Sequence, residues 1–162
     1  MKQSKQILQK IFSKEELKLQ LKRWELLEKK IVFTNGIFDI LHQGHIHILS
    51  EAAVFADILI VGVNADASVK RLKGNSRPVN AEASRALILS ALVMVDAVII
   101  FQEDTPLDLI KFIKPNVLVK GGDYTLETIV GAKEVMANKG AVKIIPLEEG
   151  FSTTGIIEKM KS

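Results

Sequence analysis

Two histidines three residues apart, His42 and His45, are the side chains in this sequence best suited to chemistry. They follow a β-branched and aromatic run, Ile31 to Thr34, that is typical of a buried strand, and they begin an amphipathic stretch that is typical of a helix. The spacing places both imidazoles on one face of the first helical turn, where free backbone N–H groups and the positive end of the helix dipole also point. An unperturbed imidazole titrates near pH ~6.5, so either side chain could donate a hydrogen bond to a phosphate or carry a proton.

Two glycines beside the histidines favour the same interpretation. Gly36 allows the backbone to turn sharply off the strand, and Gly44 removes a side chain where a ligand could approach the helix. Together the two histidines and the two glycines predict a phosphate-binding site. The alternative is a strand-to-helix connection in which the two histidines are incidental.

The residues after the first predicted strand read Gly36-x-Phe38-Asp39-x-x-His42-x-Gly44-His45. This string resembles the signature of the nucleotidyltransferases with an HxGH motif, the cytidylyltransferase-like group. The resemblance implies that both histidines bind the phosphates and stabilise them in the transition state. It also implies a set of nucleotide contacts: Asn35, Gly36, Phe38 and Gly44. We place Asp39 with the substrate-binding residues, although we expect it to support the turn and not to react.

The composition limits the possible classes of protein. The chain has 162 residues, of which 48% are hydrophobic and 25% charged, as expected for one soluble globular domain. There is no cysteine, so disulfides and thiolate chemistry are excluded, and a cytoplasmic location is compatible with that. No apolar run reaches the ~20 residues of a membrane helix, and no secretory signal is visible. We expect no membrane association.

The charge is concentrated in the first 30 residues. They hold nine Lys or Arg against four Glu, a net charge of +5, which leaves 13 basic and 15 acidic residues after them. Ser13 and Glu16 have the spacing of a capping box, so we expect a helical leader over residues 1–30 before a catalytic domain over residues 31–162. The leader could pack on the domain or form a dimer contact, or it could bind a membrane surface or a partner. No basic face with groove-reading residues predicts nucleic-acid binding.

Strand and helix patterns alternate from Ile31 onward. The expected strands are Ile31–Thr34, Asp57–Val63, Ala97–Phe101, Val117–Lys120 and Val142–Pro146. The expected helices are Gly44–Phe55, Ala81–Met94, Pro106–Lys114, Thr128–Lys139 and one from Thr153 to the end. This order predicts an α/β fold, a five-stranded parallel sheet with helices on both faces and Rossmann-like topology. Ligands then bind beyond the carboxyl ends of the strands.

Three segments that follow strands carry candidate site residues. After the second strand come polar and cationic side chains that could bind the substrate or close over a triphosphate: Asn64, Asp66, Arg71, Lys73, Arg77 and Arg85. A solvated loop is the plainer interpretation. After the fourth strand come Gly121, Gly122 and Asp123, which could bind a nucleoside or form a tight turn. After the fifth come Ser152, Thr153 and Thr154, which could cap a helix or hold phosphate oxygens.

Other nucleotide and metal motifs are absent from the sequence. It has no P-loop, no G-x-G-x-x-G and no H-E-x-x-H motif, so it does not favour a P-loop NTPase, a dinucleotide oxidoreductase or a zinc protease. Two histidines and an Asp could bind zinc, but the glycines and cationic loops suit phosphates better, so we expect no metal held by the protein itself.

Residues Ile31 to Lys161 resemble a narrower family, the adenylyltransferase domain of the bacterial ADP-heptose synthases. The matching stretches are TNGIFDILHQGH, VGVNADASVKRLKG with RPVN, EDTPLDLIKFIKPNVLVKGGDY and EEGFSTTGII. Glycerol-phosphate cytidylyltransferases share HxGH and the Ser-Thr-Thr segment, but they tend to carry an Arg where this chain has Leu147. That departure leaves open which cation contacts the triphosphate.

The narrower resemblance implies transfer of AMP from ATP, with Mg²⁺, to D-glycero-β-D-manno-heptose 1-phosphate. It implies that His42, His45 and Lys73 are catalytic and that Arg71, Arg77 and Arg85 assist. The wider resemblance to the nucleotidyltransferases with an HxGH motif implies a homodimer. The family's sugar-kinase domain has no counterpart in this sequence, so a separate kinase is expected to act upstream. Another nucleotidyltransferase, using CTP or a different phosphorylated sugar or alcohol, and a non-catalytic nucleotide-binding module are the alternatives.

Overall fold

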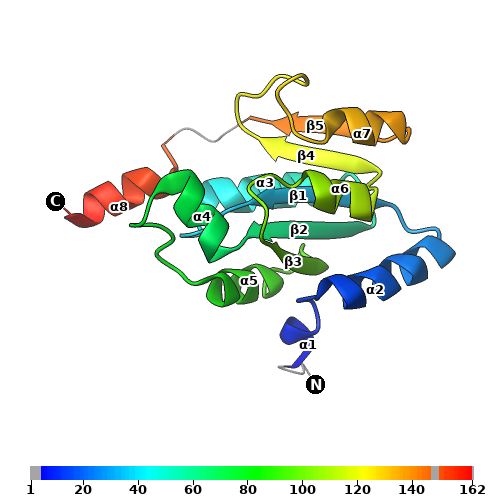
Figure 1. The fold of residues 1–162 in the computed structure, drawn as a ribbon, viewed down its shortest axis with the longest axis horizontal. Coiled ribbons are helices and arrows are strands. Elements are labelled where there is room, and N and C mark those ends of the chain that lie inside the picture. Colours follow the sequence, from blue (N-terminus) through cyan, green and yellow to red (C-terminus); the bar gives the residue numbers. More distant parts are fainter. Residues whose placement is uncertain (1–4, 147–149, 162) are drawn as a thin grey trace.

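The computed structural model describes residues 5–146 and 150–161. Its centre is a parallel sheet of five strands: β1 (Ile31–Gly36), β2 (Ile58–Asn64), β3 (Ala97–Phe101), β4 (Val117–Gly121) and β5 (Ala141–Ile145). The strand order is β3-β2-β1-β4-β5, with β3 and β5 at the two edges of the sheet in Figure 1. The chain therefore builds outward from β1 in one direction and then crosses to β4, which places the reversal of strand order between β1 and β4.

The register between β1 and β4 is short. β1 and β2 pair over six residue positions, but β1 and β4 pair only at Val32 with Val117 and at Phe33 with Leu118. Beyond those pairs the carboxyl ends of β1 and β4 have no ladder between them. This opening lies at the reversal point, where parallel sheets bind their ligands.

Helices cover both faces, as the sequence predicts. α3 (Gln43–Ala53) and α5 (Glu82–Ser90) pack on one face, while α2 (Lys14–Leu26), α6 (Leu107–Ile113) and α7 (Ala132–Ala137) pack on the other. Neighbouring strand residues alternate between the two cores, with Val32 in one and Phe33 in the other. The remaining helices are α1 (Lys5–Leu8), α4 (Asp66–Lys73) and α8 (Thr153–Lys161).

One helix begins later than its sequence pattern suggests. We expected a helix from Thr128, but α7 begins at Ala132. The Thr128 hydroxyl accepts from the Thr125 backbone N–H and donates to the Thr125 carbonyl, which stabilises a turn, and Gly131 has a φ of 87°. A left-handed residue ends that turn, so the helix can start only after it.

The leader packs onto the domain along the edge strand β3. The Phe12 N–H donates to the Val98 carbonyl at 2.9 Å, and the Val98 N–H donates to the Lys10 carbonyl at 2.7 Å. Ser13 and Glu16 form the predicted capping box at the start of α2. Leu17 and Trp24 of α2 are buried in the core. Whether residues 1–30 form a separate unit stays a prediction, but the backbone bonds of Lys10 and Phe12 cover the β3 edge at Val98, which hinders pairing with another chain there.

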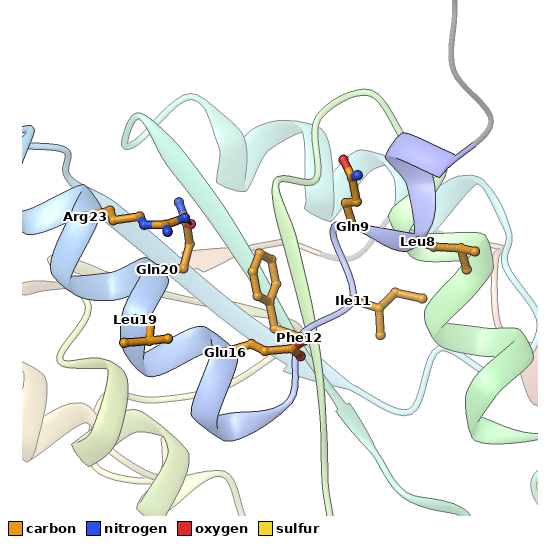
Figure 2. Close-up of a pocket in the computed structure, with 8 residues that line it drawn as sticks. All are labelled: Leu8, Gln9, Ile11, Phe12, Glu16, Leu19, Gln20 and Arg23. Atoms are coloured by element: carbon orange, nitrogen blue, oxygen red, sulfur yellow. Dashed lines mark hydrogen bonds between the residues drawn. The ribbon is translucent and has the colours of Figure 1, made fainter.

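A hollow of about 610 Å³ lies on the leader itself, between α1 and α2. Figure 2 shows Phe12 between the two helices, with Leu8 and Ile11 on one side and Gln20 and Arg23 on the other. Its lining residues are half apolar and half polar or charged, and they include none of the histidines and glycines that the sequence singles out. Within the described ranges, no helix is long and apolar enough to cross a membrane.

Replacing Trp24 should show that the leader contributes to the stability of the domain. Trp24 is 8% exposed and packs edge to face against Phe12, with ring centroids 6.4 Å apart. Trp24→Ala should lower the free energy of unfolding by about 3 kcal/mol, the usual cost of emptying a buried aromatic site. Leu19→Ala, on the same helix but 62% exposed, is the matched control and should have little effect in urea unfolding. Equal effects of the two changes would contradict a leader integrated into the core.

Candidate active site

A cavity of about 300 Å³ lies at the carboxyl ends of β1 and β4. Its wall comes from both strands, from the start of α3, from the loop after β4 and from the residues before α8. The lining residues are Thr34, Asn35, Gly36, Ile37, Phe38, His42, Gly44, His45, Ile48, Lys120, Gly121, Tyr124, Phe151, Ser152 and Thr153. The two ends of the predicted domain, the His42 region and the Ser152 region, therefore meet here.

The two histidines form a stacked pair at the start of α3. His42 is the N-cap residue, and its ring lies 3.8 Å from the ring of His45, centroid to centroid, at an interplanar angle of 25°. Phe38, held at a φ of 49°, packs its ring 5.2 Å from that of His45. Gly44 lies against this pair, because a Cβ atom there would be 3.2 Å from Nδ1 of His42. The stack is thus fixed by its neighbours.

Both imidazoles are short of hydrogen-bond partners. Nδ1 of His42 and Nδ1 of His45 are buried and have no partner within the described part of the chain. Such an unpaired buried group costs roughly 1–3 kcal/mol, which a bound phosphate oxygen could recover by accepting from a protonated ring nitrogen.

The same burial keeps the imidazoles neutral. Burial lowers the pKa of His42, and burial together with the neighbouring His42 lowers the pKa of His45 to about 4. Near pH 7 both rings are therefore uncharged in the free protein. An arriving phosphate raises the pKa of a neighbouring imidazole, so anion binding should draw a proton into the pair.

Gly121 lines the cavity and packs closely against Ile48 of α3. A Cβ atom on Gly121 would lie 2.2 Å from Cδ1 of Ile48. A side chain at that position would therefore require Ile48 to move. Ser152 caps α8, because its hydroxyl oxygen accepts from the Gly155 N–H at 3.0 Å.

The structure divides the predicted nucleotide contacts into two groups. Those that line the cavity are Asn35, Gly36, Phe38, Gly44, Gly121, Ser152 and Thr153, together with both histidines. Those that do not are Gly122, Asp123 and Thr154. Gly122 instead donates its N–H to the Ile145 carbonyl at 3.0 Å, and Asp123 and Thr154 are exposed.

The four predicted cations all lie off the cavity wall. Arg71 contacts Asp104 at 2.6 Å and donates to the Gln102 carbonyl at 2.8 Å, so it is held against the segment after β3. Lys73 is exposed at the last turn of α4. Leu147, where we noted a missing Arg, lies outside the described residues.

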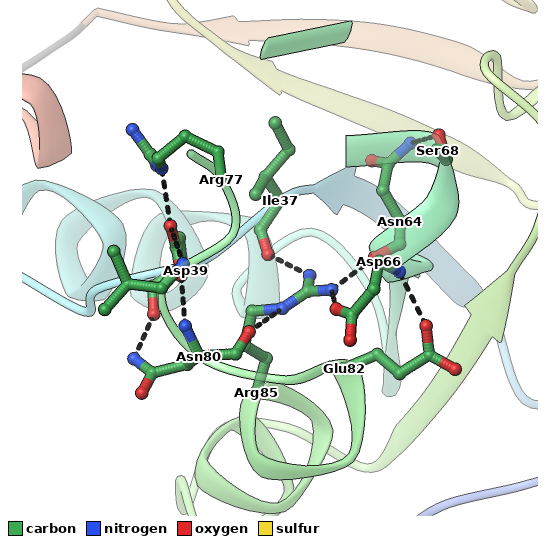
Figure 3. A network of polar contacts seen from close by, with 10 residues as sticks. Ile37, Asp39, Asn64, Asp66, Ser68, Arg77, Asn80, Glu82 and Arg85 are labelled. Atoms are coloured by element: carbon green, nitrogen blue, oxygen red, sulfur yellow. Dashed lines mark hydrogen bonds and ion pairs between the residues drawn. The ribbon is translucent and has the colours of Figure 1, made fainter. Parts of the chain in front are cut away.

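Arg85 occupies a different place from the one we expected, because its side chain is fully buried outside the cavity lining, within a network of polar contacts (Figure 3). Its guanidinium donates to the carbonyls of Ile37 at 2.6 Å, Asn80 at 2.9 Å and Asn64 at 2.8 Å, and to Oδ1 of Asp66 at 2.7 Å. These bonds tie the loop after β1 to the loop after β2 and to the start of α5. Arg85 is therefore a framework residue with its donors in use.

Asn64 and Asp66, two other predicted substrate contacts, belong to the same framework (Figure 3). The Asn64 amide donates to the Ser68 hydroxyl oxygen at 3.1 Å, and the Asp66 N–H donates to Glu82 at 2.6 Å. Neither residue lines the cavity.

Asp39 and Arg77 form a second part of this framework. Oδ2 of Asp39 contacts Nε of Arg77 at 2.6 Å, and the Val79 and Asn80 N–H groups donate to the same carboxylate. Burial alone would raise the pKa of Asp39, but the Asn80 and Val79 N–H groups and Arg77 hold that pKa below its usual value. Asp39 thus stabilises the turn, as we expected, and does not face the cavity as a substrate contact.

Lys120 is a cavity residue that our sequence analysis missed. Its Nζ donates to Oδ1 of Asn35 at 2.5 Å, and burial lowers the pKa of Lys120 to about 8. The sequence contained a signal, since a lysine directly follows the apolar run of β4, but we attributed the function of that segment to its glycines.

The described residues offer no ready metal site. Among them, no three His, Asp or Glu side chains gather where they could hold a metal ion. The cavity's own donors are imidazole, ammonium, hydroxyl and amide groups, which suit phosphate oxygens.

Arg85 should contribute more to stability than any surface arginine. Arg85→Met leaves three carbonyls and the Asp66 carboxylate without their donor, so we expect a loss of about 3 kcal/mol in the free energy of unfolding. The control is Arg71→Met, which breaks the ion pair between Arg71 and Asp104. The two side chains are 51% and 47% exposed, so this change should lower the free energy of unfolding by less than about 1 kcal/mol. Denaturant unfolding of both variants checks this; a loss below that of the control would refute the framework role.

Comparisons with known proteins support the family that the sequence motif indicates. A family model described as cytidylyltransferase-like matches residues 33–159. The bifunctional protein HldE of Campylobacter jejuni (serotype O:2) is 59% identical over 152 residues, which is 94% of this chain and 32% of that protein. The HldE of Koribacter versatilis is 53% identical over 150 residues, 93% of this chain and 31% of that protein. The chain spans about a third of the length of these relatives.

Solved structures show the same fold. The lipopolysaccharide core biosynthesis protein from Thermoplasma volcanium has a TM-score of 0.59 and 32% identity, and the match covers 74% of this chain and 97% of that one. Pantoate-beta-alanine ligase from Francisella tularensis, solved with an ATP analogue and beta-alanine, has a TM-score of 0.65 at 15% identity, over 93% of this chain and 76% of that one. The fold is thus the Rossmann-like nucleotidyltransferase fold, and the chain belongs to the cytidylyltransferase-like family.

Proposed function

We propose that this protein is an adenylyltransferase that moves AMP from ATP to D-glycero-β-D-manno-heptose 1-phosphate. The observation that carries the proposal is the stacked pair of His42 and His45 in the cavity where the strand order reverses. The Nδ1 atoms of both rings are buried and have no hydrogen-bond partner among the described residues. The high identity to proteins named HldE, 49% to 59% over most of the chain, supports the choice of substrates.

The reaction is a direct displacement. A phosphate oxygen of heptose 1-phosphate attacks the α-phosphorus of ATP, the bond from that phosphorus to the bridging oxygen breaks, and pyrophosphate leaves with the electron pair. The products are ADP-heptose and pyrophosphate. A phosphate monoester is already anionic near pH 7, so the attacking group needs no general base. The barrier lies in bringing two anions together and stabilising the phosphoryl group in transfer.

The cavity residues fit these demands. His42 and His45 donate to the phosphate oxygens once the bound anion has raised their pKa values. Ser152 and Thr153 close the other side of the phosphate site, and Gly121 forms the part of the wall where β4 ends. Mg²⁺ enters as the complex with ATP, because this ion is usually held by substrate phosphates and water.

The outer residues have supporting roles in the proposal. We assign Lys73, exposed at the last turn of α4, to steering and closing over the triphosphate, and Asp123 and Thr154 to the outer rim. Arg71 and Arg77 hold the neighbouring segments through Asp104 and Asp39, and Gly122 is held by the Ile145 carbonyl. Arg85, Asp39, Asn64 and Asp66 position the loops and do not contact substrate. A homodimer, a cytoplasmic location and a separate upstream sugar kinase stay predictions.

Cytidylyl transfer is the second candidate, because the matching family is described as cytidylyltransferase-like. Pyrophosphate release with Mg²⁺ separates the two, using ATP or CTP, each with heptose 1-phosphate or glycerol 3-phosphate. Release with ATP and the heptose alone supports the proposal. Release with another pair overturns the substrate assignment, and no release with any pair leaves a nucleotide-binding module.

His45 provides the mutational prediction. His45→Ala should keep the fold and lose at least ~10²-fold in kcat, the usual scale for one preorganised donor in a transition state. Gln43→Ala is the matched control, since Gln43 is exposed on the same helical turn and does not line the cavity. Steady-state pyrophosphate release measures both variants. Near-normal turnover by His45→Ala would refute the role of the histidine pair.

A further inference from the structure

The charges on the cavity wall are unusual for a site that must hold two anions. Among the described residues that line it, Lys120 is the one Lys or Arg, and there is no Asp or Glu. The arginines expected to meet the triphosphate are engaged elsewhere: Arg71 with Asp104, Arg77 with Asp39, and Arg85 with Asp66. The cavity thus has one ammonium group and no carboxylate beside it.

Lys120 lies where the sheet opens. The ladder between β1 and β4 stops at Phe33 and Leu118, and two residues further along each strand come Asn35 and Lys120. Their side chains bridge this gap through the hydrogen bond from Nζ to Oδ1. Asn35 therefore fixes the direction of the ammonium group and leaves two of its three N–H bonds for other partners.

We infer that Lys120, oriented by Asn35, is a further catalytic residue whose ammonium group binds the phosphoryl group in transfer. This inference rests on the proposed function and answers its open question, which cation neutralises the triphosphate inside the site.

The physical reason is the cost of burying a charge. An ammonium group taken out of water is costly unless an anion compensates it, and here the neutral Asn35 amide is its hydrogen-bond partner. A phosphate beside Nζ supplies the missing charge. In this partly buried site, that attraction is stronger than it would be at the exposed end of α4, where Lys73 lies.

This account predicts a pH dependence. The groups that face Lys120 across the cavity are His42 and His45 from α3 and Tyr124 from the loop after β4. The histidine pair is neutral near pH 8, and the pKa of Lys120 is lowered to about 8 by burial. The catalytic ammonium is therefore present below about pH 8 and lost above it, so kcat/KM should fall as the pH rises through that range. Bound phosphate raises the pKa, so kcat should fall only at higher pH.

The first test compares Lys120→Met with Lys143→Met. Lys143 lies on the neighbouring strand β5, is exposed, and has its ammonium over the Phe55 ring at 5.6 Å, outside the cavity. Lys120→Met should lose at least ~10²-fold in kcat with a smaller change in KM for ATP, while Lys143→Met should stay within about twofold of the parent. Thermal unfolding of both variants verifies folding. Lys120→Met activity near that of the control would overturn the inference.

The absence of cysteine from the chain allows a second test that a structural role would not satisfy. Lys120→Cys should be inactive. Alkylation with 2-bromoethylamine, in which sulfur displaces bromide, then rebuilds a lysine-like ammonium at this one thiol. We expect activity to return, with its alkaline fall at lower pH than in the parent, because the sulfur makes the new ammonium more acidic. If mass spectrometry shows that the thiol is completely alkylated and no activity returns, the inference is contradicted.

A binding measurement separates this inference from the proposed function. If the parent protein releases no pyrophosphate with any pair of substrates, the proposed function fails, and the calorimetric affinity for MgATP then tests Lys120. An affinity at least ~10-fold weaker in Lys120→Met than in Lys143→Met would still support a phosphate-binding ammonium. Equal affinities would overturn it.

Discussion

The short ladder between β1 and β4 is the constraint on which the site depends. Two residue pairs join these strands, and beyond them their carboxyl ends separate. The gap creates room for a ligand in the middle of an otherwise continuous sheet, and side chains from both strands line it. Lys120 and Asn35 bridge it, and Gly121 lets Ile48 of α3 pack against it. A fully paired sheet would place backbone hydrogen bonds where the account places phosphates.

The opening is kept in shape by two ion pairs, Arg77 with Asp39 and Arg85 with Asp66, whose residues do not line the cavity. Arg85 joins the loops after β1 and β2, and Asp39 joins the turn before His42 to the segment that starts α5. Breaking one partner of such a pair leaves an uncompensated buried charge, which costs more than losing a surface pair. The histidines are thus positioned by residues some 40 positions away in the sequence, and the charge of those residues is used internally.

The sequence analysis succeeded where the determining interactions are local. Apolar runs placed every strand, and the motif from Asn35 to His45 brought six predicted residues to one cavity, because one strand, one helix and the short connection between them carry all six. It failed where the outcome depends on distant partners. Nothing near Arg71, Arg77 or Arg85 in the sequence indicates that they form ion pairs with Asp104, Asp39 and Asp66, respectively. Lys120 was overlooked for the same reason, because its importance comes from Asn35 on another strand.

The most direct test of the account is a crystal structure with α,β-methylene ATP, whose bridging carbon blocks transfer. The account predicts oxygens of the α-phosphate within about 3 Å of Nζ of Lys120 and of an imidazole nitrogen of His45. It also predicts the hydrogen bond between Lys120 and Asn35 in the bound state. A triphosphate lying beside Lys73 and Arg77, along the end of α4 and the segment after it, with its α-phosphate outside the opening between β1 and β4, would contradict it.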